Sequence, residues 1–180
     1  MLRTLLIVLI LAPTFLMGQS IYKTSAASVS FSSEAPLEII QAESKKLVGL
    51  IDIEKRTFAF QVAPISFEGF NSELQREHFN ENYMESTKYP KIKFSGNILG
   101  SDDFKKPGIY KVVVKGTLSL HGQDQERQIN ALMTVSEGKI IIRSKFNVRL
   151  DDHNIKIPKI VDKKIAEIIS CDVKATLAPK

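Results

Sequence analysis

Apolar and polar residues alternate along most of the chain that follows the N-terminal segment. The clearest run extends from Ile140 to Leu150, where apolar side chains at alternate positions oppose Arg143, Lys145 and Arg149. A period of two predicts β-strands with one buried face. Comparable runs lie at 57–62, 91–98, 110–120, 129–135 and 169–177, with weaker ones at 29–31 and 47–53.

Short connections between these runs predict about eight antiparallel strands. Turn-forming residues gather at 100–108 and 136–139. A sheet with one apolar face and no long helix to cover it must stack on another sheet or close on itself. We therefore expect an all-β fold with one or two short helices, an antiparallel eight-stranded barrel with an apolar interior.

Small residues among the expected inward positions favour closure into a barrel. In an eight-stranded barrel they leave room inside for one elongated ligand. The alternative, equally open from the sequence, is that small residues only relieve crowding at barrel corners. The residues concerned are Ala59, Gly96, Gly116, Ala131, Ser144 and Ala175.

Two segments interrupt the alternation. Ser72 to Tyr83 starts with Ser-Glu-Leu-Gln, a capping-box pattern that predicts a helix start. Its apolar residues Leu74, Phe79 and Tyr83 would form a lid over an open end of the barrel. A second short helix is expected at 161–168, ahead of the last strand.

The first of these segments, with the residues just after it, holds the most conspicuous polar cluster. One histidine and three carboxylates lie there at near-helical spacing: Glu77, His78, Glu81 and Glu85. A metal site between helices needs a second ligand-bearing segment, and none is visible. His121 and His153 are isolated at a strand end and in a turn. We expect a solvated helix face and no metal site.

The N-terminus predicts export of the protein. Arg3 precedes an apolar run from Leu5 to Leu11, and small residues follow at Gly18 and Ser20. This pattern is typical of a secretory signal peptide. We expect a signal peptide at residues 1–19, one barrel domain at 20–180, and a periplasmic or secreted protein.

Composition narrows the function further. The only cysteine is Cys171, so an intramolecular disulfide is excluded, and its inward strand position predicts a buried, inert thiol. No nucleophile motif or phosphate-binding glycine loop occurs, so we expect neither an enzyme nor a cofactor. The net charge of +5 is too small to indicate nucleic-acid binding.

Basic residues recur on the outward face of three strong strands. They could provide peripheral contact with an anionic membrane surface, although a solubilising surface is the preferred interpretation. The residues are Lys91, Lys93, Lys111, Lys115, Arg143, Lys145 and Arg149.

Three segments resemble the YceI-like family of bacterial lipid-binding proteins. They are "EHFNENYMESTKYPKIKFSG" (77–96), "VKGTLSLHG" (114–122) and "NVRLDDHNIKIPKIVDKKIAEIISCDV" (147–173). The resemblance implies a lipocalin-like periplasmic barrel whose apolar tunnel holds a polyisoprenoid in some members. The chain departs from the family pattern at 123–126, after Leu-His-Gly, and in its opening strand.

We therefore expect a binding protein that holds an isoprenoid or other long-chain lipid in its barrel tunnel. The rival is a ligand-free barrel that acts through its surface as a periplasmic interaction or stress-response scaffold. The oligomeric state does not follow from the sequence. Strand parity predicts the tunnel lining as Phe58, Phe60, Val62, Ile92, Phe94, Val112, Val114, Leu118, Phe146 and Val148.

Overall fold

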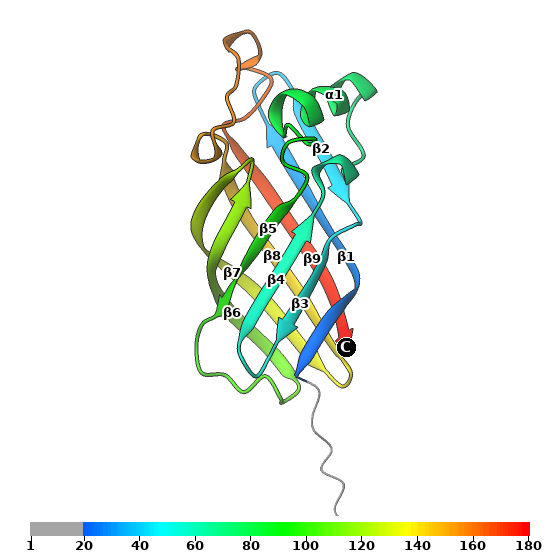
Figure 1. Cartoon of the computed structure of the whole chain (residues 1–180), viewed down its shortest axis with the longest axis vertical. Helices are drawn as coiled ribbons and strands as arrows, with labels where there is room; N and C mark the ends of the chain where they lie inside the picture. Colours follow the sequence, from blue (N-terminus) through cyan, green and yellow to red (C-terminus); the bar gives the residue numbers. More distant parts are fainter. Residues whose placement is uncertain (1–19) are drawn as a thin grey trace, which may run out of the picture.

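The computed structural model describes residues 20–180, so the expected signal peptide, residues 1–19, lies outside the described residues. The described chain forms nine strands and one short α-helix (Figure 1). The strands are β1 (Ile21–Glu34), β2 (Ile39–Ser44), β3 (Val48–Asp52), β4 (Thr57–Val62), β5 (Ile92–Ile98), β6 (Gly108–Leu120), β7 (Gln123–Ser136), β8 (Lys139–Arg149) and β9 (Ile168–Pro179).

All strand pairs are antiparallel and the sheet closes into a barrel. Neighbours along the chain pair from β3 through β9, and β9 then pairs with β1 between Tyr22 and Ser32. On its other edge β1 pairs with β3 near its start and with β2 near its end. The predicted eight-stranded antiparallel barrel is therefore confirmed. β2 and β3 together fill one strand position, because they pair with different parts of the same edge of β1.

A helical segment crosses that end of the barrel (Figure 1). The helix α1 (Glu73–His78) continues into a π-helical turn, η2 (Phe79–Tyr83). The Ser72 hydroxyl accepts a hydrogen bond from the Gln75 amide at 3.2 Å, which confirms the predicted start. The helical path stops before Glu85, whose φ of 42° is left-handed. The expectation that Glu85 shares one helix face with Glu77 and Glu81 is therefore wrong.

The expected second helix at 161–168 is also wrong. The chain there forms a loop with two short 3₁₀ turns, η3 (Asp151–His153) and η4 (Lys159–Val161), and β9 already begins at Ile168. A third such turn, η1 (Pro64–Ser66), follows β4. A helix as short as the one expected at 161–168 has only marginal stability unless one of its faces packs against the protein. Within residues 20–180 no helix is long and apolar enough to cross a membrane.

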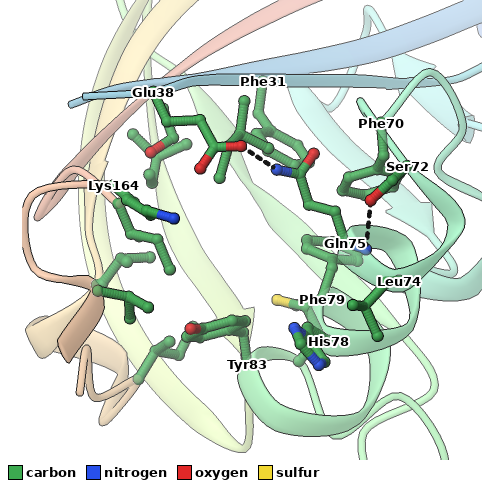
Figure 2. Close-up of a pocket in the computed structure, with 18 residues that line it drawn as sticks. Phe31, Glu38, Phe70, Ser72, Leu74, Gln75, His78, Phe79, Tyr83 and Lys164 are labelled. Atoms are coloured by element: carbon green, nitrogen blue, oxygen red, sulfur yellow. Dashed lines mark hydrogen bonds between the residues drawn. The ribbon is translucent and has the colours of Figure 1, made fainter. Parts of the chain in front are cut away.

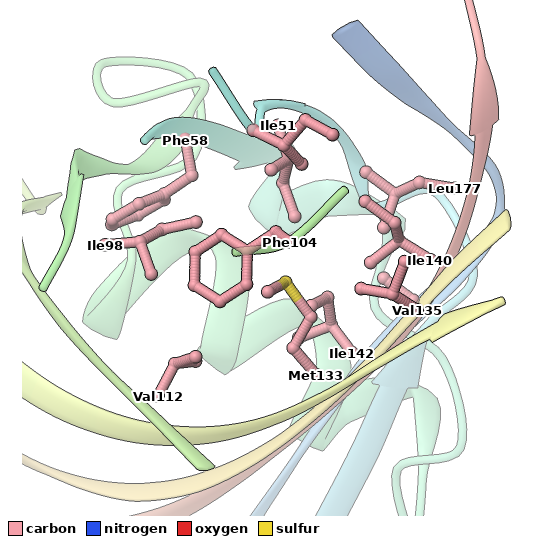
Figure 3. Close-up of a cluster of buried hydrophobic side chains, with 12 residues drawn as sticks. Ile51, Phe58, Ile98, Phe104, Val112, Met133, Val135, Ile140, Ile142 and Leu177 are labelled. Carbon is pink, nitrogen blue, oxygen red and sulfur yellow. The ribbon is translucent and has the colours of Figure 1, made fainter. Parts of the chain in front are cut away.

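The opposite end of the barrel, where the C-terminus lies, is filled with large side chains (Figure 3). Phe104, from the connection between β5 and β6, is 2% exposed and lies against Tyr110, with ring centroids 5.2 Å apart. The guanidinium of Arg56 lies 4.4 Å from the Phe104 ring centre and donates a hydrogen bond to the Asp102 carbonyl at 2.8 Å. This end of the barrel is closed.

The small residues serve different purposes. Gly96 and Gly116 face each other on β5 and β6, and a Cβ atom at either position would overlap the backbone of the facing strand. The crowding interpretation is right for this pair. Ala131 and Ser144 instead line an interior cavity. Ala59 is exposed on the outer face of β4, so its expected inward position is wrong, because Phe58 and Phe60 take the inward parity.

Candidate functional site

The middle of the barrel contains an apolar cavity of about 130 Å³. Its walls come from eight of the barrel strands, β1 and β3 to β9, and are almost entirely aliphatic and aromatic. Every residue predicted from parity to line the tunnel borders this cavity except Val148, which is 5% exposed and packs nearer the lid. The bordering residues are Phe58, Phe60, Val62, Ile92, Phe94, Val112, Val114, Leu118 and Phe146. Contact of these residues with a ligand stays a prediction.

A second cavity of about 380 Å³ lies at the open end, beneath the helical segment. Leu74, Phe79 and Tyr83, the residues expected to form the lid, all border it (Figure 2). The opposite wall comes from the loop between β8 and β9, through Val161 and Ile165. We call this the mouth cavity. Its volume falls within the range typical of small-molecule sites.

The two cavities follow one another along the same strands. On β9, Val173 borders the interior cavity and Ile169 borders the mouth cavity, with half-buried Cys171 between them on the same face. On β1, Val29 borders the interior cavity and Phe31 borders the mouth cavity. A layer of side chains therefore divides a single apolar path.

Phe79 is the part of this dividing layer that the lid contributes. Its ring stacks on that of Phe31 with centroids 5.3 Å apart and an interplanar angle of 17°. It also lies near Phe67 and Phe70, at 5.8 and 5.0 Å. Phe79 belongs to a short helical segment and not to the barrel wall, so displacement of α1 and η2 would remove its ring from this layer.

Several polar side chains border the mouth cavity, most of them on the helical segment (Figure 2). Gln75 donates a hydrogen bond from Nε2 to Glu38 Oε1 at 3.0 Å. Lys164 lies across the cavity from the helical segment, as Figure 2 shows. Burial raises the pKa of Tyr83, so its hydroxyl stays protonated. An amphipathic ligand could place its apolar part inside and its polar end near these polar groups.

A histidine and carboxylate pair fixes the end of the lid, and sequence reasoning missed it. His121 Nε2 lies 2.7 Å from Glu85 Oε2, and its Nδ1 lies 3.0 Å from the carbonyl oxygen of His153. The Tyr89 ring packs edge-on against His121 at 4.7 Å. The expectation that His121 is isolated is therefore wrong. One signal could have indicated this pair. Glu85 and His121 lie in two of the segments that carry the family resemblance, 77–96 and 114–122.

The other candidate chemistry is absent from the described residues. His78 is exposed at the rim, and residues 20–180 contain no cluster of three or more potential metal ligands. Cys171 is half-buried, and burial raises the pKa of its thiol to about 12, as expected of an unreactive cysteine.

The outward basic residues do not form one continuous band. All seven are exposed, but β7 separates β6 from β8 and places acidic Glu126 beside Thr117. Two of the seven are paired: Lys145 with Asp172 at 3.4 Å and Arg149 with Glu167 at 3.6 Å. The barrel wall is therefore a weaker membrane-binding candidate than the alternation suggested.

Known structures with the same fold place the barrel among characterised relatives. A polyisoprenoid binding domain from Saccharophagus degradans, implicated in plant cell wall breakdown, has a TM-score of 0.75 at 14% identity, covering 88% of this chain and 98% of that one. BcnA from Burkholderia cenocepacia has a TM-score of 0.69 at 14% identity, with coverages of 83% and 95%. The Campylobacter jejuni YCEI protein has a TM-score of 0.56 at 15% identity, with coverages of 72% and 78%.

At these identities the structural likeness establishes the fold. A comparison with curated proteins gave no match. The model of the YceI-like domain, however, matches residues 22–177, which is nearly the whole described barrel. The chain therefore belongs to the YceI-like family.

Proposed function

We propose that the barrel binds a long apolar molecule, a polyisoprenoid or similar lipid, with its chain inside the barrel and its polar end at the mouth. The observation that carries this proposal is the pair of apolar cavities aligned along the barrel, the inner one almost entirely apolar and the outer one bordered by more polar groups. The structural relative from Saccharophagus degradans, described as a polyisoprenoid binding domain, supports the same ligand class.

Burial of apolar surface would supply the affinity. Removing apolar surface from water contributes on the order of 25 cal/mol for each Å² buried, without any directional bond. The interior cavity offers almost no hydrogen-bonding partner beyond Gln61 and Ser144. Such a site selects for length and shape, and a ligand that fills both cavities must displace Phe79.

The rival, a ligand-free scaffold acting through its surface, predicts a completely filled barrel. The closed end meets that expectation, but the cavities in the middle and at the mouth do not. Catalysis would need converging polar groups inside, and Ser144 is occupied by a hydrogen bond to the Asn130 carbonyl at 2.7 Å. We therefore propose binding and not catalysis.

We also propose that the protein is exported and acts in the periplasm or outside the cell. Arg3 and the apolar run that follows support this location, as does the recognised family. Sequencing the N-terminus of the protein recovered from a cell-envelope fraction tests it. A first residue near Ser20 is the expected result, and an uncleaved Met1 in the cytosolic fraction would contradict it.

Native mass spectrometry followed by solvent extraction tests the proposed ligand. The purified protein should carry a discrete added mass that extracts as an isoprenoid or another long-chain lipid. Ala131 borders the interior cavity, so Ala131→Leu should fill part of it and reduce the fraction of protein that carries ligand. Ala59 lies on the outer wall, so Ala59→Leu should leave that fraction unchanged. Both proteins should keep the barrel, which circular dichroism checks.

A clean unliganded mass, with no uptake from a lipid panel, would reject the carrier function. Equal loss of ligand from the Ala131 and Ala59 variants would reject the interior cavity as the binding site.

A further inference from the structure

The rim of the mouth carries a projecting loop that the proposed ligand site does not explain. We call residues 156–165 the mouth loop. It extends beyond the strands at the end of the barrel opposite the C-terminus (Figure 1). The Leu37 amide in the β1–β2 turn donates a hydrogen bond to the Lys163 carbonyl at 2.9 Å, so the turn and the loop form one surface beside the mouth.

This surface exposes apolar side chains at its outermost positions. Ile160 is 91% exposed, and Leu37, on the adjoining turn, is 68% exposed. The neighbouring apolar residues Val161 and Ile165 face the mouth cavity instead. The mouth loop is therefore apolar toward both the cavity and the outside, whereas a loop that only covers a cavity needs apolar residues on one side.

The same loop is strongly basic. It contains four lysines and one acidic residue, Asp162. None of these lysines forms an ion pair with a described residue, in contrast to Lys145 and Arg149 on the wall. The lysines are Lys156, Lys159, Lys163 and Lys164.

The opposite side of the mouth has the opposite charge. Helix α1 and its continuation expose Glu73, Glu77 and Glu81, with a single arginine, Arg76, which pairs with Glu73 at 3.2 Å. A negatively charged surface would therefore attract the mouth loop and repel the helical lid. Such a surface would hold the barrel tilted, with the lid free to move.

We propose that the mouth loop docks the protein on an anionic phospholipid bilayer, with Ile160 and Leu37 inserted at the interface and the lysines at the head groups. Exposed apolar residues flanked by lysines are the chemistry that binds such interfaces. The role of this docking rests on the proposed function, because it would let a lipid pass between the bilayer and the mouth cavity without crossing water. The binding itself can be measured independently of any ligand.

Vesicle co-sedimentation of the purified protein tests the docking. The vesicles contain phosphatidylcholine alone or phosphatidylcholine mixed with phosphatidylglycerol. The protein should bind the mixed vesicles at low salt, bind the neutral ones weakly, and be released as salt screens the charges. The combined Lys156→Gln, Lys159→Gln and Lys163→Gln variant should bind on the order of a hundredfold more weakly, at roughly fivefold per lysine. Lys164 is left intact because it borders the mouth cavity.

Matched variants on the wall separate the mouth loop from general surface charge. Lys111→Gln, Lys115→Gln and Lys174→Gln remove three exposed lysines that are unpaired among the described residues, and binding should change little. Ile160→Ser should weaken binding about tenfold, by losing one inserted side chain. Ile109→Ser, at a residue 72% exposed near the closed end, should have no effect.

Three outcomes would overturn the proposal. They are absence of binding to anionic vesicles at low salt, equal losses from the mouth and wall variants, and a dimer in solution that Ile160→Ser dissociates, which would make a second copy the occupant of this surface. Extraction of lipid from the same preparations separates the two proposals. Retained ligand without vesicle binding rejects only the docking, whereas vesicle binding without any ligand rejects only the lipid-binding function.

Discussion

His153 is a fully buried histidine next to the turn between β6 and β7. Burial is the main cause that lowers its pKa below the ordinary value, and the nearby backbone of Leu120 and Gln123 opposes this effect only in part. The folded protein therefore prefers the neutral imidazole. The backbone carbonyl of His153 also contacts His121 Nδ1, so this buried residue lies next to the Glu85 and His121 pair.

We predict that acidification destabilises the protein through His153. As pH falls below the ordinary histidine value, the unfolded chain binds a proton that the folded protein resists, so the free energy of unfolding decreases by at most about 1.4 kcal/mol per pH unit for this group. Urea titrations at neutral and mildly acidic pH measure the slope. His153→Gln should flatten it, whereas His78→Gln, at an exposed site, should not. Identical slopes in all three proteins would contradict the assignment.

At the residue scale, the sequence could predict which strand residues face the barrel interior. It could not predict contacts between side chains far apart in the chain. Cys171 was correctly placed inside because alternation fixes the face of a strand residue. Glu85 and His121 lie 36 positions apart, and no local pattern relates them. Their contact depends on where the helical segment ends, which is set by the left-handed backbone at Glu85. Neither a glutamate nor a histidine in the sequence reliably indicates a left-handed backbone or a helix end.

At the scale of elements, the lid is attached to the barrel by few buried side chains. Its helix α1 has no buried residue, and its packing depends on Phe79 and on Met84, which is 6% exposed. The cap at Ser72 and the contact between Glu85 and His121 hold its two ends. An element with few buried contacts opens locally at a lower free energy than the barrel.

We expect Ser72→Ala to loosen the lid without affecting the strands. The change removes the oxygen that accepts the Gln75 amide, a loss of about 1 kcal/mol. Amide hydrogen exchange over 73–83 should accelerate roughly fivefold, while exchange in β6 and β7 stays unchanged. Asn82→Ala, at an exposed position in the same segment, serves as the control. Equal acceleration across the whole barrel would mean that the lid does not open separately.

The strands could be predicted at this scale because alternation is strong wherever one face is buried. The segment 161–168 was misjudged because its apolar residues also suit a helix. The structure uses Val161 and Ile165 to line the mouth cavity and leaves Ile160 exposed. Periodicity alone does not distinguish a short amphipathic helix from a loop that is apolar on two sides.

The molecule as a whole has one open end and one closed end. Large side chains, among them Met133 and Ile140, fill the end near the C-terminus, and Phe104 packs over them. Closure into a barrel could be predicted from small residues at the expected inward positions, of which Ala131 and Ser144 do line the interior cavity. The position of the filling could not, because parity shows that a residue points inward and does not show how far along the barrel it lies.

We predict that Phe104→Ala destabilises the barrel by about 3 to 4 kcal/mol, since it leaves a cavity in a packed end and removes the ring beneath Arg56. Urea unfolding measures the loss. Ile109→Ala, in the same region but 72% exposed, should cost less than about 0.5 kcal/mol. Similar values for the two variants would show that Phe104 does not close this end.

The closed end has a consequence for the order in which a ligand moves. A chain that enters a bore with only one opening goes in tail first and leaves in the reverse direction, so the group that enters last is always the first to emerge. Under the proposed lipid-binding function, the floor formed around Met133 and Phe104 would be a fixed stop that limits how much of an apolar chain the barrel encloses. The part of a longer chain beyond that limit would extend out of the mouth.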